Sequence, residues 1–204
     1  IRRVQAYATG LAHAMGMSET EAQAIRTAAL LHDIGKLAIP EHILAKPGPL
    51  TPEEYQKVRL HPEVGAEIIR AVPFPYPVAP LILSHHERWD GRGEPGRLKG
   101  EEKALAARIA HLAGDVEIFH RIGGIEAAIA VVQERSGEAY DPRIAQRFCQ
   151  EAQRLLGGIE TEPIWESVLE AEPSPRRWIN EVQLDKITRA MAHFTDVKSP
   201  YTVG

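Results

Sequence analysis

Apolar residues recur at helical spacing along most of the chain, and this periodicity restricts the fold more than any other feature. One stripe near the N-terminus ends in front of Gly16; it contains Val4, Tyr7, Ala8, Leu11, Ala12 and Met15. Strands would need alternating runs rich in valine or threonine, and the sequence has no long run of that kind. We therefore expect an all-α fold.

Several segments carry the polar residues that begin helices. Ser18 and Glu21 have the spacing of a capping box, which predicts a helix running to about residue 32, and Gly35 is expected to end it. Thr51 and Pro52 predict another helix start, because a hydroxyl caps free backbone N–H groups and proline is tolerated in the first turn.

Proline and glycine predict where helices are interrupted. Prolines between residues 73 and 80 break the pattern before residues 78–87 resume it, and the glycine-rich segment 90–100 is expected to be a loop. Further helices are expected over residues 101–120, 123–136, 141–157, 161–171 and 180–196. The proline-containing segment 172–175 is the best candidate for a linker.

Composition excludes several classes of protein. The 204 residues include 24 Lys and Arg against 28 Asp and Glu, and the resulting net charge of −4 does not favour binding to extended nucleic acid. No stretch reaches the roughly 18–20 apolar residues of a membrane span, so we expect a cytoplasmic protein without a membrane partner. Because Cys149 is the single cysteine, a metal site here must use histidine and carboxylate ligands.

Histidines follow apolar segments at several predicted helix ends. His32 and Asp33 follow one apolar segment, His85 and His86 follow another, and His61 precedes a proline at a helix break. A single histidine at a helix end is usually a capping residue, but this combination favours metal ligation. Since adjacent helical residues point about 100° apart, His85 and His86 could serve two neighbouring ions. We expect surface or structural roles for the other histidines, which are His13, His42, His111, His120 and His193.

Four segments in this order resemble successive motifs of the HD-GYP family of the HD phosphohydrolase superfamily. They begin at Leu30, Ile43, His61 and His85, and a fifth match at Tyr140-Asp141-Pro142 closes the similarity, which covers roughly residues 1–150. The resemblance implies an all-α HD-domain helical bundle, here with extra C-terminal helices. It also implies a phosphodiesterase that hydrolyses cyclic di-GMP or a related cyclic dinucleotide.

The family's site residues can be carried over to matching positions of this sequence. The resemblance implies two or three divalent transition-metal ions, with Fe or Mn favoured over Zn, Ni or Mg. It also implies attack of a metal-bridging hydroxide on phosphorus, with the Asp33 carboxylate bridging two ions. Catalytic roles fall on Asp33 and Lys36, and substrate contacts on Lys36, Arg88 and Asp90. The implied metal ligands are His32, Asp33, His61, His85, His86 and Asp115.

The sequence also departs from the family pattern. Glu94 replaces the tyrosine of the Gly-Tyr-Pro motif. The family's last aspartate ligand falls at Gly114, one residue before Asp115, so Asp115 needs a local distortion such as a π-bulge to face the metals. These departures keep two alternatives open. One is a degenerate HD signalling module that binds a nucleotide or partner without hydrolysis; the other is an HD nucleotide phosphohydrolase acting on monoesters.

The ends of the chain predict two parts. Residues 1–157 are expected to form the HD-GYP-like domain and residues 158–204 a C-terminal helical extension. The last nine residues resemble the lead-in to the family's first helix, and an upstream ligand would precede Ile1. The extension is therefore interpreted as a lead-in to a second HD domain, or as a helix that forms a homodimer, in a protein with adjoining HD or signalling domains.

Overall fold

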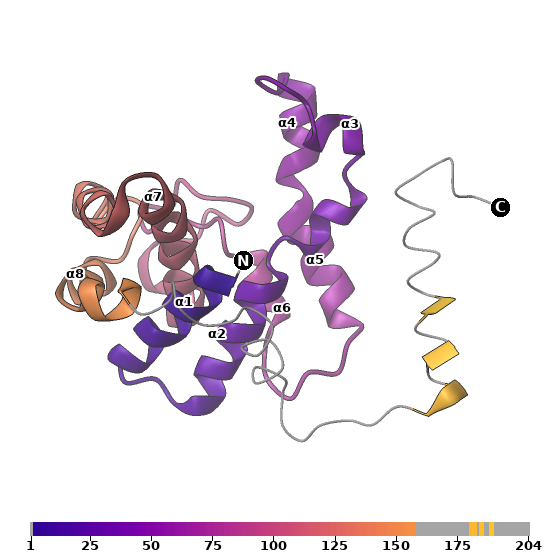
Figure 1. Cartoon of the computed structure of the whole chain (residues 1–204). Helices are drawn as coiled ribbons and strands as arrows, with labels where there is room; N and C mark the ends of the chain where they lie inside the picture. Colours follow the sequence, from indigo (N-terminus) through magenta and orange to yellow (C-terminus); the bar gives the residue numbers. More distant parts are fainter. Residues whose placement is uncertain (1, 158–179, 183, 186–187, 190–204) are drawn as a thin grey trace. The chain divides into compact units, whose positions relative to one another are not determined.

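The computed structural model describes residues 2–157, 180–182, 184–185 and 188–189. All regular elements among them are helices (Figure 1), and the only β-pairings are two isolated bridges, so the all-α expectation is confirmed. The elements are α1 (Arg2–Ala14), α2 (Glu19–Leu31), η1 (Ile34–Ala38), α3 (Glu41–Leu44), α4 (Pro52–Arg59), α5 (His61–Arg70), α6 (Ala79–Leu83), η2 (Gly100–Glu102), α7 (Leu105–Glu134) and α8 (Pro142–Leu156).

The predicted helix starts are present with their capping bonds. The hydroxyl of Ser18 accepts the backbone N–H of Glu21, while the Glu21 carboxylate accepts the backbone N–H of Ser18. Thr51 and Glu54 form the same reciprocal pair at the start of α4. Each pair satisfies N–H groups that lack partners inside the helix, and such caps typically stabilise a helix by about 1 kcal/mol.

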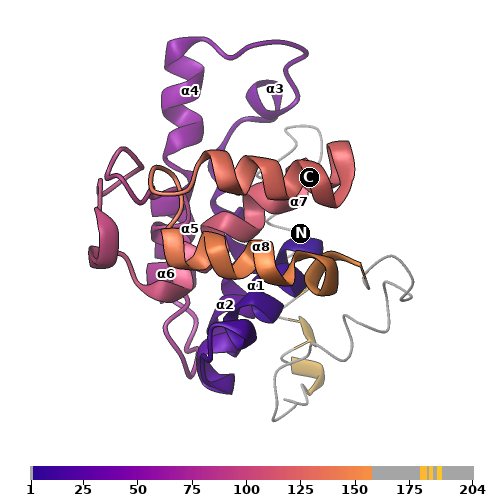
Figure 2. The same cartoon turned by 90° about the vertical axis from the view of Figure 1, so that its left-hand side faces the viewer.

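The hydrophobic core lies where α1 packs on α2 and α7, and where α7 packs on α8. Figure 2 shows α1, α7 and α8 in neighbouring positions. The predicted stripe on α1 faces this core, since Val4, Tyr7, Ala8 and Leu11 are all buried. Helix α5, which begins with His61, packs on α6 and on η1, and this brings His61 near Asp33, which precedes η1, and near His85 and His86, which follow α6.

Two expectations about where helices end are wrong. The helix predicted over 78–87 ends at Leu83, because the side chains of Ser84 and His85 bond the carbonyls of Pro80 and Ile82 and replace the next backbone turn. The break predicted between helices 101–120 and 123–136 is present as a kink in α7, since Gly123 and Gly124 have non-helical backbone angles.

Gly35 lies inside the 3₁₀ helix η1 and does not end α2, which stops at Leu31.

The chain divides into two compact units: residues 1–39 with 48–160, and residues 40–47 with 161–204. The predicted helix 161–171 and linker 172–175 lie outside the described residues. Within 180–189, the described residues 181, 182, 184, 185, 188 and 189 are helical, which agrees with the helix predicted there. The division into a domain of 1–157 and an extension of 158–204 stays a prediction. No helix in the described part of the chain is long and apolar enough to cross a membrane.

Candidate metal centre

Three histidines lie just after the ends of three different helices: α2, α4 and α6. In each case the ring Nδ1 lies within hydrogen-bond distance of the backbone carbonyl three residues earlier. The pairs are His32 with Ala29 at 2.8 Å, His61 with Val58 at 2.7 Å and His85 with Ile82 at 2.6 Å. These carbonyls belong to last helical turns, which lack some intrahelical partners. Capping by a nearby histidine therefore fixes the orientation of each ring.

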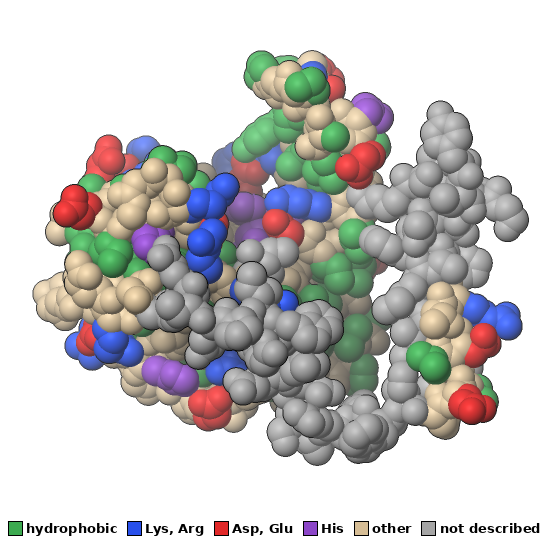
Figure 3. All heavy atoms as spheres, in the orientation of Figure 1, with side chains coloured by type: hydrophobic (Ala, Val, Ile, Leu, Met, Phe, Trp, Pro, Cys, Tyr) green, Lys and Arg blue, Asp and Glu red, His purple; other side chains and the backbone are tan. Residues whose placement is uncertain are grey.

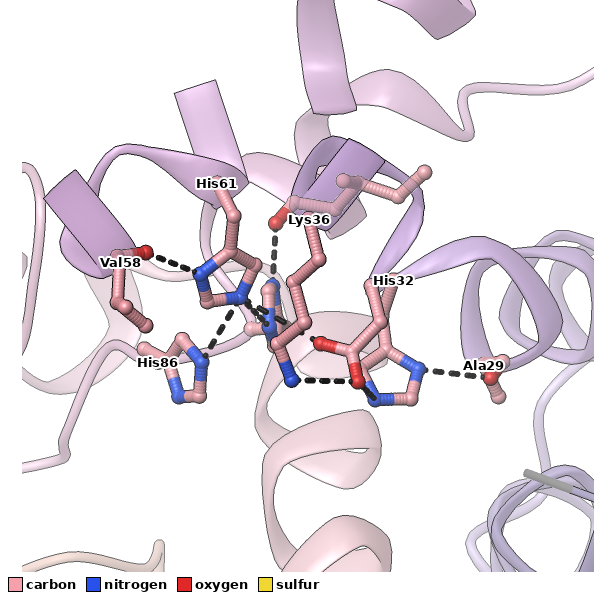
Figure 4. Close-up of polar contacts among 9 residues, drawn as sticks. Ala29, His32, Lys36, Val58, His61 and His86 are labelled. Carbon is pink, nitrogen blue, oxygen red and sulfur yellow. Dashed lines mark hydrogen bonds and ion pairs between the residues drawn. The ribbon is translucent and has the colours of Figure 1, made fainter. Parts of the chain in front are cut away.

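The carbonyl bonds fix which ring nitrogen carries the proton. A carbonyl only accepts, so Nδ1 of each of these rings is the donor, and Nε2 of a neutral ring presents a lone pair. Nε2 of His61 lies 3.3 Å from Nε2 of His85 and 3.2 Å from Nε2 of His86 (Figure 4). His61 and His85, whose Nδ1 atoms both donate to carbonyls, therefore turn lone pairs toward each other, and these repel unless a cation lies between them. The donor set therefore fits a divalent metal ion, whose histidine ligands commonly donate their other ring N–H to a carbonyl.

Protonation does not relieve this repulsion at neutral pH. Burial, reinforced by the neighbouring His86 ring, lowers the pKa of His85 to about 2. Loss of hydration and the neighbouring His61 lower the pKa of His86 to about 4, and burial also lowers the pKa of His61. The rings of His61, His85 and His86 are therefore mainly neutral at pH 7, and the neutral ring is the form that binds metal.

Asp33 lies between two of these histidines. Its Oδ2 is 3.6 Å from Nε2 of His32, and its Oδ1 is 3.5 Å from Nε2 of His61. Each carboxylate oxygen thus faces a different ring, as a carboxylate shared between two ions would. Burial alone would raise the pKa of Asp33, but the bond from Lys36 and the nearby His32 outweigh it and lower the pKa, so the group is an anion.

Lys36 lies in η1 beside the cluster, and its Nζ donates a 2.7 Å bond to Oδ2 of Asp33. Figure 4 shows the side chain of Lys36 between His61 and His32, extending toward the centre of the cluster. Its side chain is 38% exposed, so the ammonium faces both the carboxylate and the solvent-filled side of the site. This position allows it to contact a bound anion.

Two glycines allow η1 to approach α5 closely enough to assemble the cluster. A Cβ built on Gly35 would lie 1.9 Å from the carbonyl oxygen of His61 and 2.6 Å from the backbone nitrogen of Gly65. Only hydrogen fits in this space. The close contact sets the backbone of Asp33 and Lys36 beside the first turn of α5, which begins with His61.

A cavity of about 280 Å³ opens beside the cluster. In the space-filling view, histidine side chains lie in a hollow next to basic and acidic side chains (Figure 3). The residues lining the cavity come from α1, α2, η1, α7 and the segment after α6; they are Val4, Ala29, His32, Asp33, Lys36, His85, His86, Ala110, His111, Gly114, Asp115, Glu117 and Ile118. The cavity is large enough for part of a nucleotide and presents both signs of charge.

Asp115 reaches the wall of this cavity but is engaged elsewhere. Its Oδ2 accepts a 2.6 Å bond from the Tyr140 hydroxyl and a longer one of 3.4 Å from Arg135. Residues 105–122 of α7 are α-helical, without the π-bulge that the sequence required for Asp115 to face the metals. The role of Asp115 as a ligand stays a prediction, and the structure does not bring its carboxylate into the group formed by His61, His85 and His86.

His111 lines the same cavity, although the sequence assigned it to a surface or structural role. Its ring contacts that of Tyr140 at a centroid distance of 5.5 Å. Burial and the nearby Lys103 lower the pKa of His111 to about 3, so the ring is neutral. The only signal in the sequence was its spacing of four residues before Asp115 on one helix face.

The predicted substrate contacts Arg88 and Asp90 bond to each other. Arg88 donates from Nε and Nη2 to the two carboxylate oxygens of Asp90, at 3.1 and 2.7 Å. Neither residue lines the cavity, so their contact with substrate stays a prediction. Glu94, which replaces the family's tyrosine, forms an ion pair with Arg59 and links this loop to α4.

Glu87 was not singled out from the sequence. Its buried carboxylate accepts the backbone N–H groups of Gly96 and Leu98, and its carbonyl accepts a bond from Lys103. These bonds hold the 90–100 loop against the segment that carries His85 and His86. Glu87 therefore acts on the site through the loop rather than by facing the cluster.

The fold and the cluster together define an all-helical domain with a histidine and aspartate site suited to divalent metal ions. The model of the HD domain family matches residues 1–144. The chain therefore belongs to the HD domain family, and the expected HD-GYP membership is confirmed.

Comparison with known proteins gives relatives of one kind. The chain is 37% identical over 146 residues to a cyclic di-GMP phosphodiesterase of Thermotoga maritima, a match covering 68% of this chain and 40% of the relative. It is 42% identical over 125 residues to 3'3'-cGAMP-specific phosphodiesterase 2 of Vibrio cholerae, covering 60% of this chain and 23% of the relative. The crystal structure of a cyclic GMP-AMP specific phosphodiesterase of Vibrio cholerae (V-cGAP3) matches with a TM-score of 0.78 and 25% identity. That match covers 99% of this chain and 56% of the other. The chain thus spans 40% or less of the length of these two curated relatives.

Proposed function

We propose that this chain is a metal-dependent phosphodiesterase that hydrolyses a cyclic dinucleotide, with cyclic di-GMP as the favoured substrate. The observation that carries the proposal is the convergence of four histidine Nε2 atoms and the Asp33 carboxylate, with separations of 3.2–3.6 Å. The relatives named above, which act on cyclic di-GMP and 3'3'-cGAMP, support the choice of substrate.

The proposed metal ligands are His32, Asp33, His61, His85 and His86. Nitrogen donors with one carboxylate suit iron and manganese, and two ions are proposed because the two Asp33 oxygens face different histidines. When bound, such ions lower the pKa of a coordinated water and stabilise negative charge on phosphoryl oxygens.

The chain's own residues prepare the site for this chemistry. The backbone carbonyls hold the Nδ1 protons of three histidines, so these rings keep one orientation and one tautomer. Lys36 binds a non-bridging phosphate oxygen through Nζ, which lies 2.7 Å from Asp33 at the cavity wall. Dimerisation through the C-terminal helix and the presence of adjoining domains stay predictions.

The test is hydrolysis by the 204-residue chain loaded with Mn²⁺ or with Fe²⁺ under anaerobic conditions. Cyclic di-GMP, 3'3'-cGAMP and a nucleoside monophosphate serve as separate substrates, and the products are identified by liquid chromatography and mass spectrometry. We expect a linear dinucleotide from a cyclic substrate, no hydrolysis of the monophosphate, and loss of activity with chelator and in His61→Ala.

Two results would replace the proposal. Binding of a cyclic dinucleotide without hydrolysis by metal-loaded protein would indicate a signalling module. Faster release of phosphate from the monophosphate would indicate a nucleotide phosphohydrolase.

A further inference from the structure

The two sides of the cluster differ in how many ligands the chain supplies. On one side, His61, His85 and His86 place ligand atoms within 4.8 Å of one another, and Oδ1 of Asp33 adds an oxygen. On the other side, the described residues place Nε2 of His32 and Oδ2 of Asp33 opposite each other, at 3.6 Å. Divalent transition metals bind four to six ligands, and catalytic ions usually take about three of them from the protein, so an ion on this second side has room for another donor from the chain.

The cavity wall opposite offers few free donors. Two carboxylates of α7 line the cavity, and both are engaged: Asp115 by Tyr140 and Arg135, and Glu117 by Arg3 at 3.0 Å. Position 114, where the family pattern has an aspartate ligand, is a glycine. Nothing lies within 4 Å of a Cβ built on Gly114, so the space that the missing carboxylate would use is open.

His111 lies three residues before Gly114, which is about one helical turn, and lines the same cavity as His32 and Asp33. Among the described residues, its Nδ1 is buried without a hydrogen-bond partner. A buried ring nitrogen without a partner is costly, and the other buried side-chain nitrogens without a partner among the described residues all belong to arginines, whose charge cannot bind a metal ion. The imidazole is also longer than an aspartate side chain, so it can reach across the open space that Gly114 leaves.

We propose that His111 is a metal ligand that replaces the missing carboxylate of position 114 and completes the ion held by His32 and Asp33. This inference rests on the proposed function, because it requires an ion at that position. Exchanging a carboxylate for an imidazole leaves the site richer in nitrogen and less negative by one charge. The site should then favour cobalt, nickel or zinc over manganese more strongly than a site with the carboxylate.

The test counts bound metal without measuring activity. The metal-free 204-residue chain is loaded with excess Co²⁺ and passed through a desalting column; cobalt per chain is then measured by plasma mass spectrometry, and the visible d–d absorption is recorded. We expect two ions in the wild type and one in His111→Ala, with loss of part of the absorption. His111→Asn is closer in size to the wild type and should also bind one ion, so it replaces the alanine variant if that variant does not fold.

Two further variants separate ligation from packing. His111→Ala combined with Gly114→Asp should regain the second ion, because the carboxylate returns to the open space at position 114. His120→Ala removes a histidine of the same helix that bonds Tyr7 and does not line the cavity, so it should keep both ions.

The outcomes distinguish this inference from the proposed function. Two ions and an unchanged spectrum in the His111 variants would overturn the role of His111 and leave the metal-dependent function intact. A wild type that binds only one ion would also overturn it. A wild type that binds no ion would refute the proposed function and the role of His111 together.

Discussion

Replacing Gly35 by alanine tests whether the close approach of η1 to α5 assembles the site. The added Cβ would lie 1.9 Å from the His61 carbonyl oxygen, whereas ordinary contacts begin at 3.4 Å, so the segments must separate by about 1.5 Å (3.4 − 1.9). Overpacking of this kind costs about 1–3 kcal/mol, and the obstacle here is backbone, which places the cost at the upper end. For a chain of this size, that free energy lowers Tm by roughly 4–12 °C.

The same displacement should weaken metal binding, because Asp33 and His61 are only 3.5 Å apart and move with the two segments. We expect affinity for Mn²⁺ to fall at least about tenfold. Gly114→Ala is the matched control: a Cβ there meets nothing within 4 Å, and alanine in a helix stabilises by about 0.5–1 kcal/mol. Calorimetry and metal titration measure both effects. A Tm and a metal affinity unchanged in Gly35→Ala would refute the reasoning.

Three further predictions follow from single side chains. Lys36→Ala should keep the metal and slow turnover of cyclic di-GMP about 10- to 100-fold, since it removes a positive charge at the phosphate; equal turnover would show that the contact is wrong. Burial lowers the pKa of Lys103 to about 8 from 10.5, so between these pH values the unfolded chain binds more protons and the free energy of unfolding should rise with pH. Urea unfolding should show this rise in the wild type and not in Lys103→Met. Glu94→Gln breaks the ion pair with Arg59, whose side chain is 32% exposed, and should lower the free energy of unfolding by less than about 1 kcal/mol. A larger decrease, measured by thermal unfolding, would mean that the fold of the loop depends on this pair.

Helix starts could be predicted from the sequence because capping is local. Ser18 with Glu21, and Thr51 with Glu54, lie three residues apart and satisfy each other without help from the rest of the chain. The end of α6 was placed too late, because the apolar pattern continues while the His85 ring bonds the Ile82 carbonyl. Side-chain capping of that kind competes with the next helical turn and leaves no trace in hydrophobic periodicity.

The histidine cluster could be predicted because its members follow apolar helices in a motif order that resembles a known family. The surroundings of Asp115 could not, since Tyr140 is 25 residues away and its hydroxyl meets the carboxylate only through packing of the folded chain. His111 was missed for a related reason: a single histidine within an apolar helix has the same pattern whether it is structural or faces a cavity.

The proposed function requires that His32, Asp33, His61, His85 and His86 hold divalent ions. The most direct measurement is a crystal structure of the chain loaded with Mn²⁺, with diffraction data collected above and below the manganese absorption edge. We expect anomalous difference peaks within bonding distance of Nε2 of His61 and of the Asp33 carboxylate oxygens. Loaded crystals in which these side chains are ordered and no peak lies among them would contradict it.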